Sequence, residues 1–174
     1  MSSTQVVIPT DELDRAVAAV HEVVDPIWNR TMQDPEAILS DFLEEFLEDP
    51  KGLMALISKK SGLRVLGYGN SRVALELPGD LAVKVAMHGE GEDNNQNEEW
   101  TWNKVREADI GQHFMPIIAV DPDGKWLLMP LADKWPNGEE VPVDSRNAVR
   151  EYCIDDGDYN WGVWNGKPVL LDYE

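Results

Sequence analysis

The stretch LRVLGYGNSRVALELPGDLAVKVAM, residues 63–87, decides the fold of this chain. Residues 63–66 and 72–77 alternate between apolar and polar side chains, as strands with one buried face do, and residues 81–87 form a third apolar run. Pro78-Gly79-Asp80, between the last two runs, has the composition of a tight turn. Strands joined by such short connections pair with their neighbours, so the stretch predicts a three-stranded antiparallel meander.

The residues that follow extend this sheet. After a polar loop over 88–93, the pattern predicts a helix over 94–108. Two further strands are expected over 115–120 and 125–131, joined by the turn-forming sequence Asp121-Pro122-Asp123-Gly124. Together with the meander they predict a five-stranded antiparallel sheet with one helix against it, which is an α+β architecture.

The last part of the chain contains a linker, a helix and a hairpin, at residues 133–142, 146–152 and 161–173. Asp144 and Ser145 are residues that cap the beginning of a helix. Asn165-Gly166 between apolar runs is the strongest short-range signal for a two-residue hairpin turn.

The chain before the meander, residues 1–62, predicts helices. Three are expected, over 10–26, 35–47 and 51–60. We expect Thr10 to cap the first helix, Pro26 to end it, and Gly62 to end the third, because proline interrupts helices and glycine terminates them.

Composition limits the classes of partner. The chain has 33 Asp and Glu against 15 Lys and Arg in 174 residues, a formal net charge of −18, so it will not hold nucleic-acid phosphates or an anionic membrane by broad electrostatics. A basic protein partner, mimicry of a polyanion, or adaptation to a saline habitat all remain open. The single cysteine, Cys153, excludes an intramolecular disulfide, and neither a signal peptide nor a membrane-length apolar run is evident, so we expect an intracellular protein.

Specific polar residues lie on this framework in a defined order. Gly67, Gly69, Asn70 and Ser71 separate the first two strands, and Lys84 is the only charge within the third. The other members of the order are Glu98 on the next helix, Asp155 and Asn160 before the hairpin, and Asp172 at its end.

This order resembles the protein-kinase-like fold, and it is most similar to small kinase-like proteins of phages and related viruses. The matching segments are Gly69-Asn70-Ser71-Arg72-Val73, Lys84-Val85-Ala86, Asn94-Asn95-x-x-Glu98 and an Asp-x-x-x-x-Asn pair at Asp155 and Asn160. The resemblance covers about residues 63–174. It implies an N-terminal helical extension over 1–62, a kinase-like N-lobe over 63–132 and a truncated C-lobe over 133–174.

The resemblance also implies roles and cofactors, namely ATP and Mg²⁺. Gly67, Gly69 and Ser71 would cover the phosphates, Lys84 would hold them, and Glu98 would position Lys84. Asp155 would be the catalytic base, and Asn160 and Asp172 would bind the metal. Each has a plainer alternative: turn glycines, a solvent-facing Lys84, a solvated helix face at Glu98, an acidic turn, and an unanchored chain end at Asp172.

The chain departs from the family pattern in two places. Cys153-Ile154 precede Asp155, where the family has His-Arg or His-Gly, and Tyr173-Glu174 follow Asp172 in place of Phe-Gly. No segment matches an activation loop or a substrate-binding helix. We therefore expect an acidic viral pseudokinase or interaction protein that engages a protein partner, a host factor or virion component, in the host cytoplasm or the virion. The alternative is a minimal Mg·ATP-dependent phosphotransferase that uses Lys84, Glu98, Asp155, Asn160 and Asp172.

Overall fold

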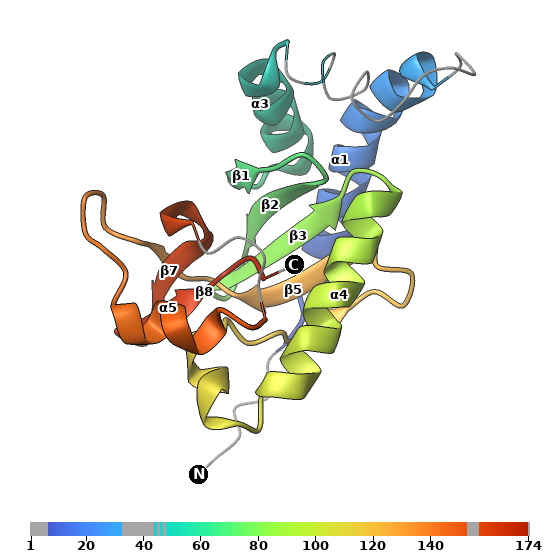
Figure 1. Cartoon of the computed structure of the whole chain (residues 1–174). Helices are drawn as coiled ribbons and strands as arrows, with labels where there is room; N and C mark the ends of the chain where they lie inside the picture. The colour runs from blue at the N-terminus through green and yellow to red at the C-terminus, as the bar shows by residue number, and fades with distance from the viewer. Residues whose placement is uncertain (1–6, 33–43, 45, 47, 153–156, 174) are drawn as a thin grey trace.

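The computed structural model describes residues 7–32, 44, 46, 48–152 and 157–173, and it is an α+β protein built on a five-stranded antiparallel sheet (Figure 1). The strands lie in the order β1-β2-β3-β5-β4. Their bounds are β1 Val65–Tyr68, β2 Arg72–Leu77, β3 Leu81–Ala86, β4 Ala119–Val120 and β5 Trp126–Pro130. The predicted meander, β1-β2-β3, and the five-stranded sheet are confirmed.

Helices and a second, smaller sheet complete the described part of the chain. The α-helices are α1 Thr10–Thr31, α3 Pro50–Ser61, α4 Gly89–Val105 and α5 Val143–Val149, and the 3-10 helices are η1 Asp109–His113 and η2 Asp158–Asn160. The second sheet has the order β6-β7-β8, with bounds β6 Asp133–Lys134, β7 Trp161–Trp164 and β8 Lys167–Leu170. Among the described residues no helix is long and apolar enough to cross a membrane.

The two faces of the large sheet have different coverings (Figure 1). Val73, Leu75 and Val83 point to one face, where they pack in a core with apolar side chains of α1 and α3. Arg72 and Lys84 are displaced by an odd number of residues from these, so they point to the opposite face, toward α4. All six residues of β3 are buried, because this central strand is covered on both sides.

Helix α1 corrects two expectations. It begins with Thr10 as its first residue after an N-cap at Pro9, with no side-chain cap. It then continues through Pro26 to Thr31. A proline inside a helix costs about 3 kcal/mol. Val24 and Ile27 on either side of it are buried, and burial of such side chains contributes about 1.5–3 kcal/mol each, which offsets that cost.

Helix α4 begins earlier than predicted. Residues 89–93, expected as a loop, form its first turns, and it ends at Val105 rather than at residue 108. Gly91 explains the early start, because a Cβ there would lie 2.3 Å from the backbone oxygen of Ser71. The absence of a side chain lets this helix end pack directly against the turn between β1 and β2.

Several boundaries in the second half also differ. The strand expected over 115–120 is reduced to β4, because Met115 N donates to Leu170 O and is drawn toward the small sheet. Part of the expected linker forms β6, which pairs with β7. Helix α5 begins at Val143 after Pro142, so Asp144 lies in its first turn and is not its cap.

Other local predictions agree with the structure. Gly62 ends α3 with φ 72°, as expected. The cap of that helix, which was not predicted, is Asp49, whose side chain accepts from Gly52 N at 3.0 Å. Asn165 and Gly166 have φ 52° and 73°, as a two-residue hairpin turn requires. The helix expected over 35–47 lies almost entirely outside the described residues.

Candidate functional site

Lys84 and Glu98 form a buried ion pair between β3 and α4. Lys84 Nζ donates to Glu98 Oε1 at 2.7 Å and to Oε2 at 2.9 Å. The Glu98 side chain is fully buried, and the Lys84 side chain is 11% exposed. The solvent-facing alternatives for both residues are therefore wrong.

The end of the small hairpin brings Asp172 to the same place. Lys84 Nζ donates to Leu171 O at 2.7 Å and to Asp172 Oδ1 at 3.0 Å. Figure 1 shows the C-terminal end of the chain lying beside β3 and α4. Asp172 is held there by Tyr173, whose buried ring packs edge-on to Phe114 and whose hydroxyl donates to Met115 O at 2.9 Å.

Arg72 is the fourth member of this site, although no role was expected for it from the sequence. Its guanidinium donates to Glu98 Oε1 at 2.7 Å, to Asn95 Oδ1 at 3.2 Å and to Asp172 Oδ1. Arg72 and Lys84 lie on neighbouring strands at positions that face the same side of the sheet. The alternation of side chains along the two strands, which puts Arg72 and Lys84 on the same face, is the feature of the sequence that could have identified Arg72. We call Arg72, Lys84, Glu98 and Asp172 the quartet.

The pKa values of the two carboxyl groups in the quartet are shifted in opposite directions. Complete burial raises the pKa of Glu98 to about 7, although Lys84 and Arg72 oppose the shift. Burial also acts to raise the pKa of Asp172, but the charges of Lys84 and Arg72 outweigh it and hold that pKa well below its usual range. Asp172 is therefore the permanent anion of the quartet, and Glu98 is the group that takes up a proton near neutral pH.

The glycine turn, predicted over residues 67–71, lies next to the quartet but is not part of its ion pairs. In the structure Gly67 and Tyr68 are the end of β1, so the turn itself is formed by residues 69–71. A Cβ at Gly67 or Gly69 would meet no atom within 4 Å, so internal packing does not require glycine at either position. Ser71 is buried, and its Oγ accepts from Asn94 Nδ2 at 3.2 Å. Ser71 thus faces the beginning of α4.

The predicted catalytic-type loop is described only in part. Asp155 lies outside the described residues. Asn160 is half-buried at the start of the hairpin, and its carbonyl oxygen accepts from Leu171 N at 2.7 Å, so the backbone places it across from the residue that precedes Asp172. An ion pair between Arg146 on α5 and Asp158 fastens the same segment to that helix.

The quartet as arranged does not fit Mg·ATP. Lys84 Nζ has three protons and lies within 3.0 Å of four protein oxygens, so a phosphate would have to displace one of them. Asp172 Oδ1 accepts from both Lys84 and Arg72, which places two cations where a metal would have to bind. Among the described residues, no group of three His, Cys, Asp or Glu side chains is arranged to hold a metal ion. ATP and Mg²⁺ stay predictions of the resemblance.

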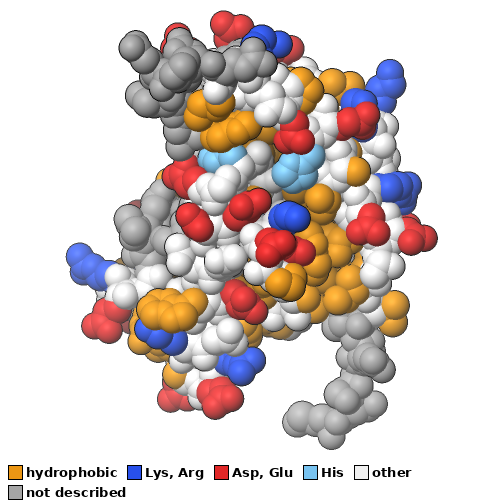
Figure 2. Space-filling view, turned by 90° about the vertical axis from the view of Figure 1, so that its right-hand side faces the viewer, with side chains coloured by type: hydrophobic (Ala, Val, Ile, Leu, Met, Phe, Trp, Pro, Cys, Tyr) orange, Lys and Arg blue, Asp and Glu red, His pale blue; other side chains and the backbone are white. Residues whose placement is uncertain are grey.

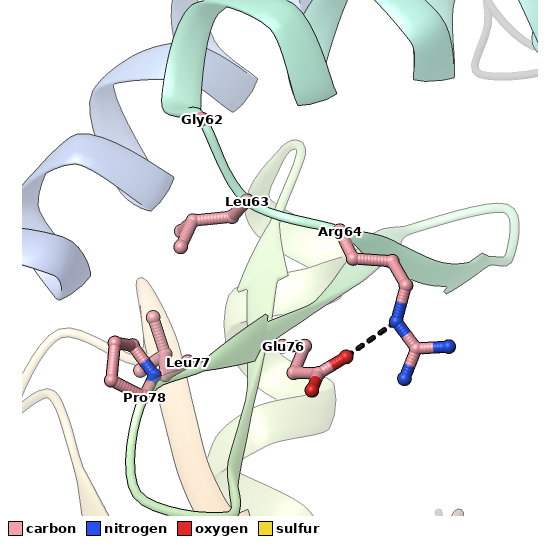
Figure 3. Close-up of a pocket in the computed structure, with 6 residues that line it drawn as sticks. All are labelled: Gly62, Leu63, Arg64, Glu76, Leu77 and Pro78. Carbon is pink, nitrogen blue, oxygen red and sulfur yellow. Dashed lines mark hydrogen bonds and ion pairs between the residues drawn. The ribbon is translucent and has the colours of Figure 1, made fainter.

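A surface hollow of about 460 Å³ lies elsewhere, where α3 leads into β1 beside the end of β2 (Figure 3). Its lining residues are Gly62, Leu63, Arg64, Glu76, Leu77 and Pro78. Figure 3 shows Arg64 and Glu76 directed toward one another as an ion pair. None of the predicted site residues lines this hollow.

Comparison with protein-family models and with curated proteins gives no match to this chain.

Proposed function

We propose that this protein is a kinase-like interaction protein, a pseudokinase of viral type, whose buried quartet maintains the fold and does not transfer phosphate. One observation carries the proposal. Both cations of the quartet are engaged by carboxylates of the protein itself, and the four residues come from β2, β3, α4 and the end of the hairpin. An ion-pair cluster of this kind joins the large sheet to the small one.

The acidic surface supports a basic protein partner. Figure 2 shows Asp and Glu side chains distributed over the face on which α4 lies, with apolar side chains exposed among them. Exposed acids on α4 include Glu90, Asp93 and Glu99, and Trp100 on the same helix is 61% exposed. A surface of one dominant sign attracts partners of the opposite sign and makes their association depend on salt. A basic host factor or virion component is the partner class that this surface fits.

The first test is a thermal-shift titration of the whole chain with Mg·ATP. We expect no change in melting temperature, because a ligand stabilises a protein only when it binds the folded state. A rise that disappears in Lys84→Met would contradict the proposal.

The second test addresses the partner. The chain is used to capture proteins from a host lysate at low and high salt, with and without Mg·ATP. We expect capture of a basic protein that weakens at high salt and does not depend on nucleotide. Nucleotide-dependent capture would refute the proposal.

A minimal Mg·ATP-dependent phosphotransferase remains the second candidate. The Lys84–Glu98 pair favours it, because a strand lysine held by a helix glutamate is the arrangement that kinases use to bind phosphates. In that case Mg·ATP raises the melting temperature, and Asp172→Asn abolishes the dependence on metal. The two candidates give opposite results in one experiment.

A further inference from the structure

Arg72 lies at the centre of a set of oxygen ligands. Its guanidinium contacts Glu98 Oε1, Asn95 Oδ1 and Asp172 Oδ1, which belong to two carboxyl groups and one amide. Carboxylate and amide oxygens are the ligands that hard divalent cations take. The Arg72 side chain is 7% exposed, and its partners Glu98 and Asn95 are fully buried, whereas Asp172 is 33% exposed.

The amide oxygen in this set is oriented by a second contact. Asn95 is fully buried, and its Nδ2 donates to Gly124 O at 2.7 Å in the turn between β4 and β5. The other end of the amide, Oδ1, is thereby directed at Arg72. A fixed orientation of this kind is how surrounding residues prepare an oxygen to bind a cation.

A second cation at this position balances the two carboxyl groups when both are ionised. Glu98 and Asp172 lie together with Lys84 between them, and Lys84 supplies one positive charge. Arg72 supplies the second. When both carboxyl groups are ionised, loss of Arg72 would leave one negative charge uncompensated beside the fully buried Glu98, which is destabilising.

We infer that Arg72 is a resident cation of this site: its guanidinium occupies the place beside Asp172 where the kinase resemblance puts Mg²⁺, and it makes the fold independent of metal. This inference rests on the proposed function, since it explains how a kinase-like site is closed without a bound metal. The cation is covalently part of β2, so it is always present. Exchange with a divalent ion is then blocked by the side chain itself.

The test removes the guanidinium in two ways. Arg72→Ala removes the charge and opens space among the three oxygens, and Arg72→Met removes the charge but keeps most of the volume. Melting temperatures of the full-length variants are measured with EDTA and with excess Mg²⁺, and Mn²⁺ binding is measured by electron paramagnetic resonance.

We expect the wild type to be unaffected by Mg²⁺ and to bind no Mn²⁺ at this site. Arg72→Ala loses roughly 10 °C of melting temperature in EDTA, recovers part of it in Mg²⁺, and binds Mn²⁺. Arg72→Met is destabilised to a similar degree but is not rescued, because the methionine fills the space. Adding Asp172→Asn to Arg72→Ala abolishes the rescue and the Mn²⁺ signal.

Three results overturn the inference. The first is a rise in the melting temperature of the wild type with Mg²⁺ that is lost in Asp172→Asn, and the second is equal rescue of Arg72→Ala and Arg72→Met by Mg²⁺. The third is an Arg72→Ala chain whose melting temperature does not rise with Mg²⁺ and that binds no Mn²⁺. An Arg72→Ala chain that stays unfolded in both EDTA and Mg²⁺ belongs to the last class. The proposed function fails separately. Metal-free ATP binding to the wild type would refute the pseudokinase proposal and leave Arg72 as the resident cation.

Discussion

The titration of Glu98 gives the sharpest prediction of this structure, and Glu98→Gln is the substitution that tests it. The glutamine is nearly isosteric, carries no charge, and cannot ionise. Glu98 is fully buried, and its pKa is raised from 4.5 to about 7 in the folded protein. Ionising this group is therefore harder in the folded chain than in the unfolded chain.

The direction in which the free energy of unfolding changes with pH depends on which state, folded or unfolded, binds more protons. Between the unfolded and folded pKa values the folded state keeps a proton on Glu98 that the unfolded state has lost, so stability falls as pH rises through this window. The shift corresponds to about 3 kcal/mol in full, of which about 2–3 kcal/mol falls between about pH 5 and about pH 8. Asp172 contributes no slope there, because its pKa is depressed and it is ionised in both states throughout the window.

The assay is equilibrium unfolding in urea, followed by tryptophan fluorescence, at several pH values. We expect the wild type to lose about 2–3 kcal/mol relative to Glu98→Gln between about pH 5 and about pH 8. Glu99→Gln is the matched control, since Glu99 is the next residue on α4 but is exposed. Its difference from the wild type should stay within about 0.5 kcal/mol.

A flat difference between wild type and Glu98→Gln would refute this reasoning. So would a difference of the opposite sign, in which the wild type gains on Glu98→Gln as pH rises. A flat difference would mean that Lys84 and Arg72 fully offset the cost of burying the Glu98 charge, and the opposite sign would mean that they outweigh it.

Three further predictions concern the framework around the quartet. Gly91→Ala should lower stability by about 2 kcal/mol or more in urea unfolding, because its Cβ would meet a backbone oxygen at 2.3 Å, whereas Gly67→Ala, with open space, should cost less than about 1 kcal/mol. Tyr173→Phe should cost about 1–2 kcal/mol in the same assay, since Met115 O loses its buried donor; no loss would show that the hydroxyl does not anchor the chain end. Ionised Asp172 stabilises the fold above the ordinary aspartate pKa, and this contribution is lost progressively as pH falls below about 4. Asp172→Asn should therefore make stability depend less steeply on pH below about 4 in acid unfolding followed by circular dichroism, and an unchanged dependence would contradict this.

The fold was predictable from the sequence where local chemistry determines it. Alternation in the first two strands predicted the meander, the turn over 121–124 predicted the pairing of β4 with β5, and Asn165-Gly166 predicted the hairpin, and all three agree with the structure. The predicted ends of helices were wrong where contacts with residues distant in the sequence override the local pattern. Burial of the α1 face carries that helix past Pro26, and packing of Gly91 against the glycine turn converts a predicted loop into helix.

The residues of the candidate site likewise fall into those that local sequence patterns identify and those that they do not. Lys84 was identifiable as a lone charge in an apolar strand, and Glu98 through the order of residues that resembles the protein-kinase-like fold. Arg72 was missed because it opens a strand after a turn, where a charge is unremarkable until its side of the sheet is compared with that of Lys84. The placement of Asp172 depends on Tyr173 reaching Met115, a contact between residues 58 positions apart that no local pattern encodes.

The quartet and the acidic surface are separable properties of this protein. Two cations and two carboxyl groups cancel when all are ionised, so the net charge of −18 comes from residues outside the quartet. A conservative change such as Lys84→Met should therefore alter stability and leave a folded population with the same surface. If partner capture by that folded population equals capture by the wild type, the surface carries recognition. If capture is lost although the variant remains folded, the quartet takes part in recognition, and the division between a structural centre and a binding surface is wrong.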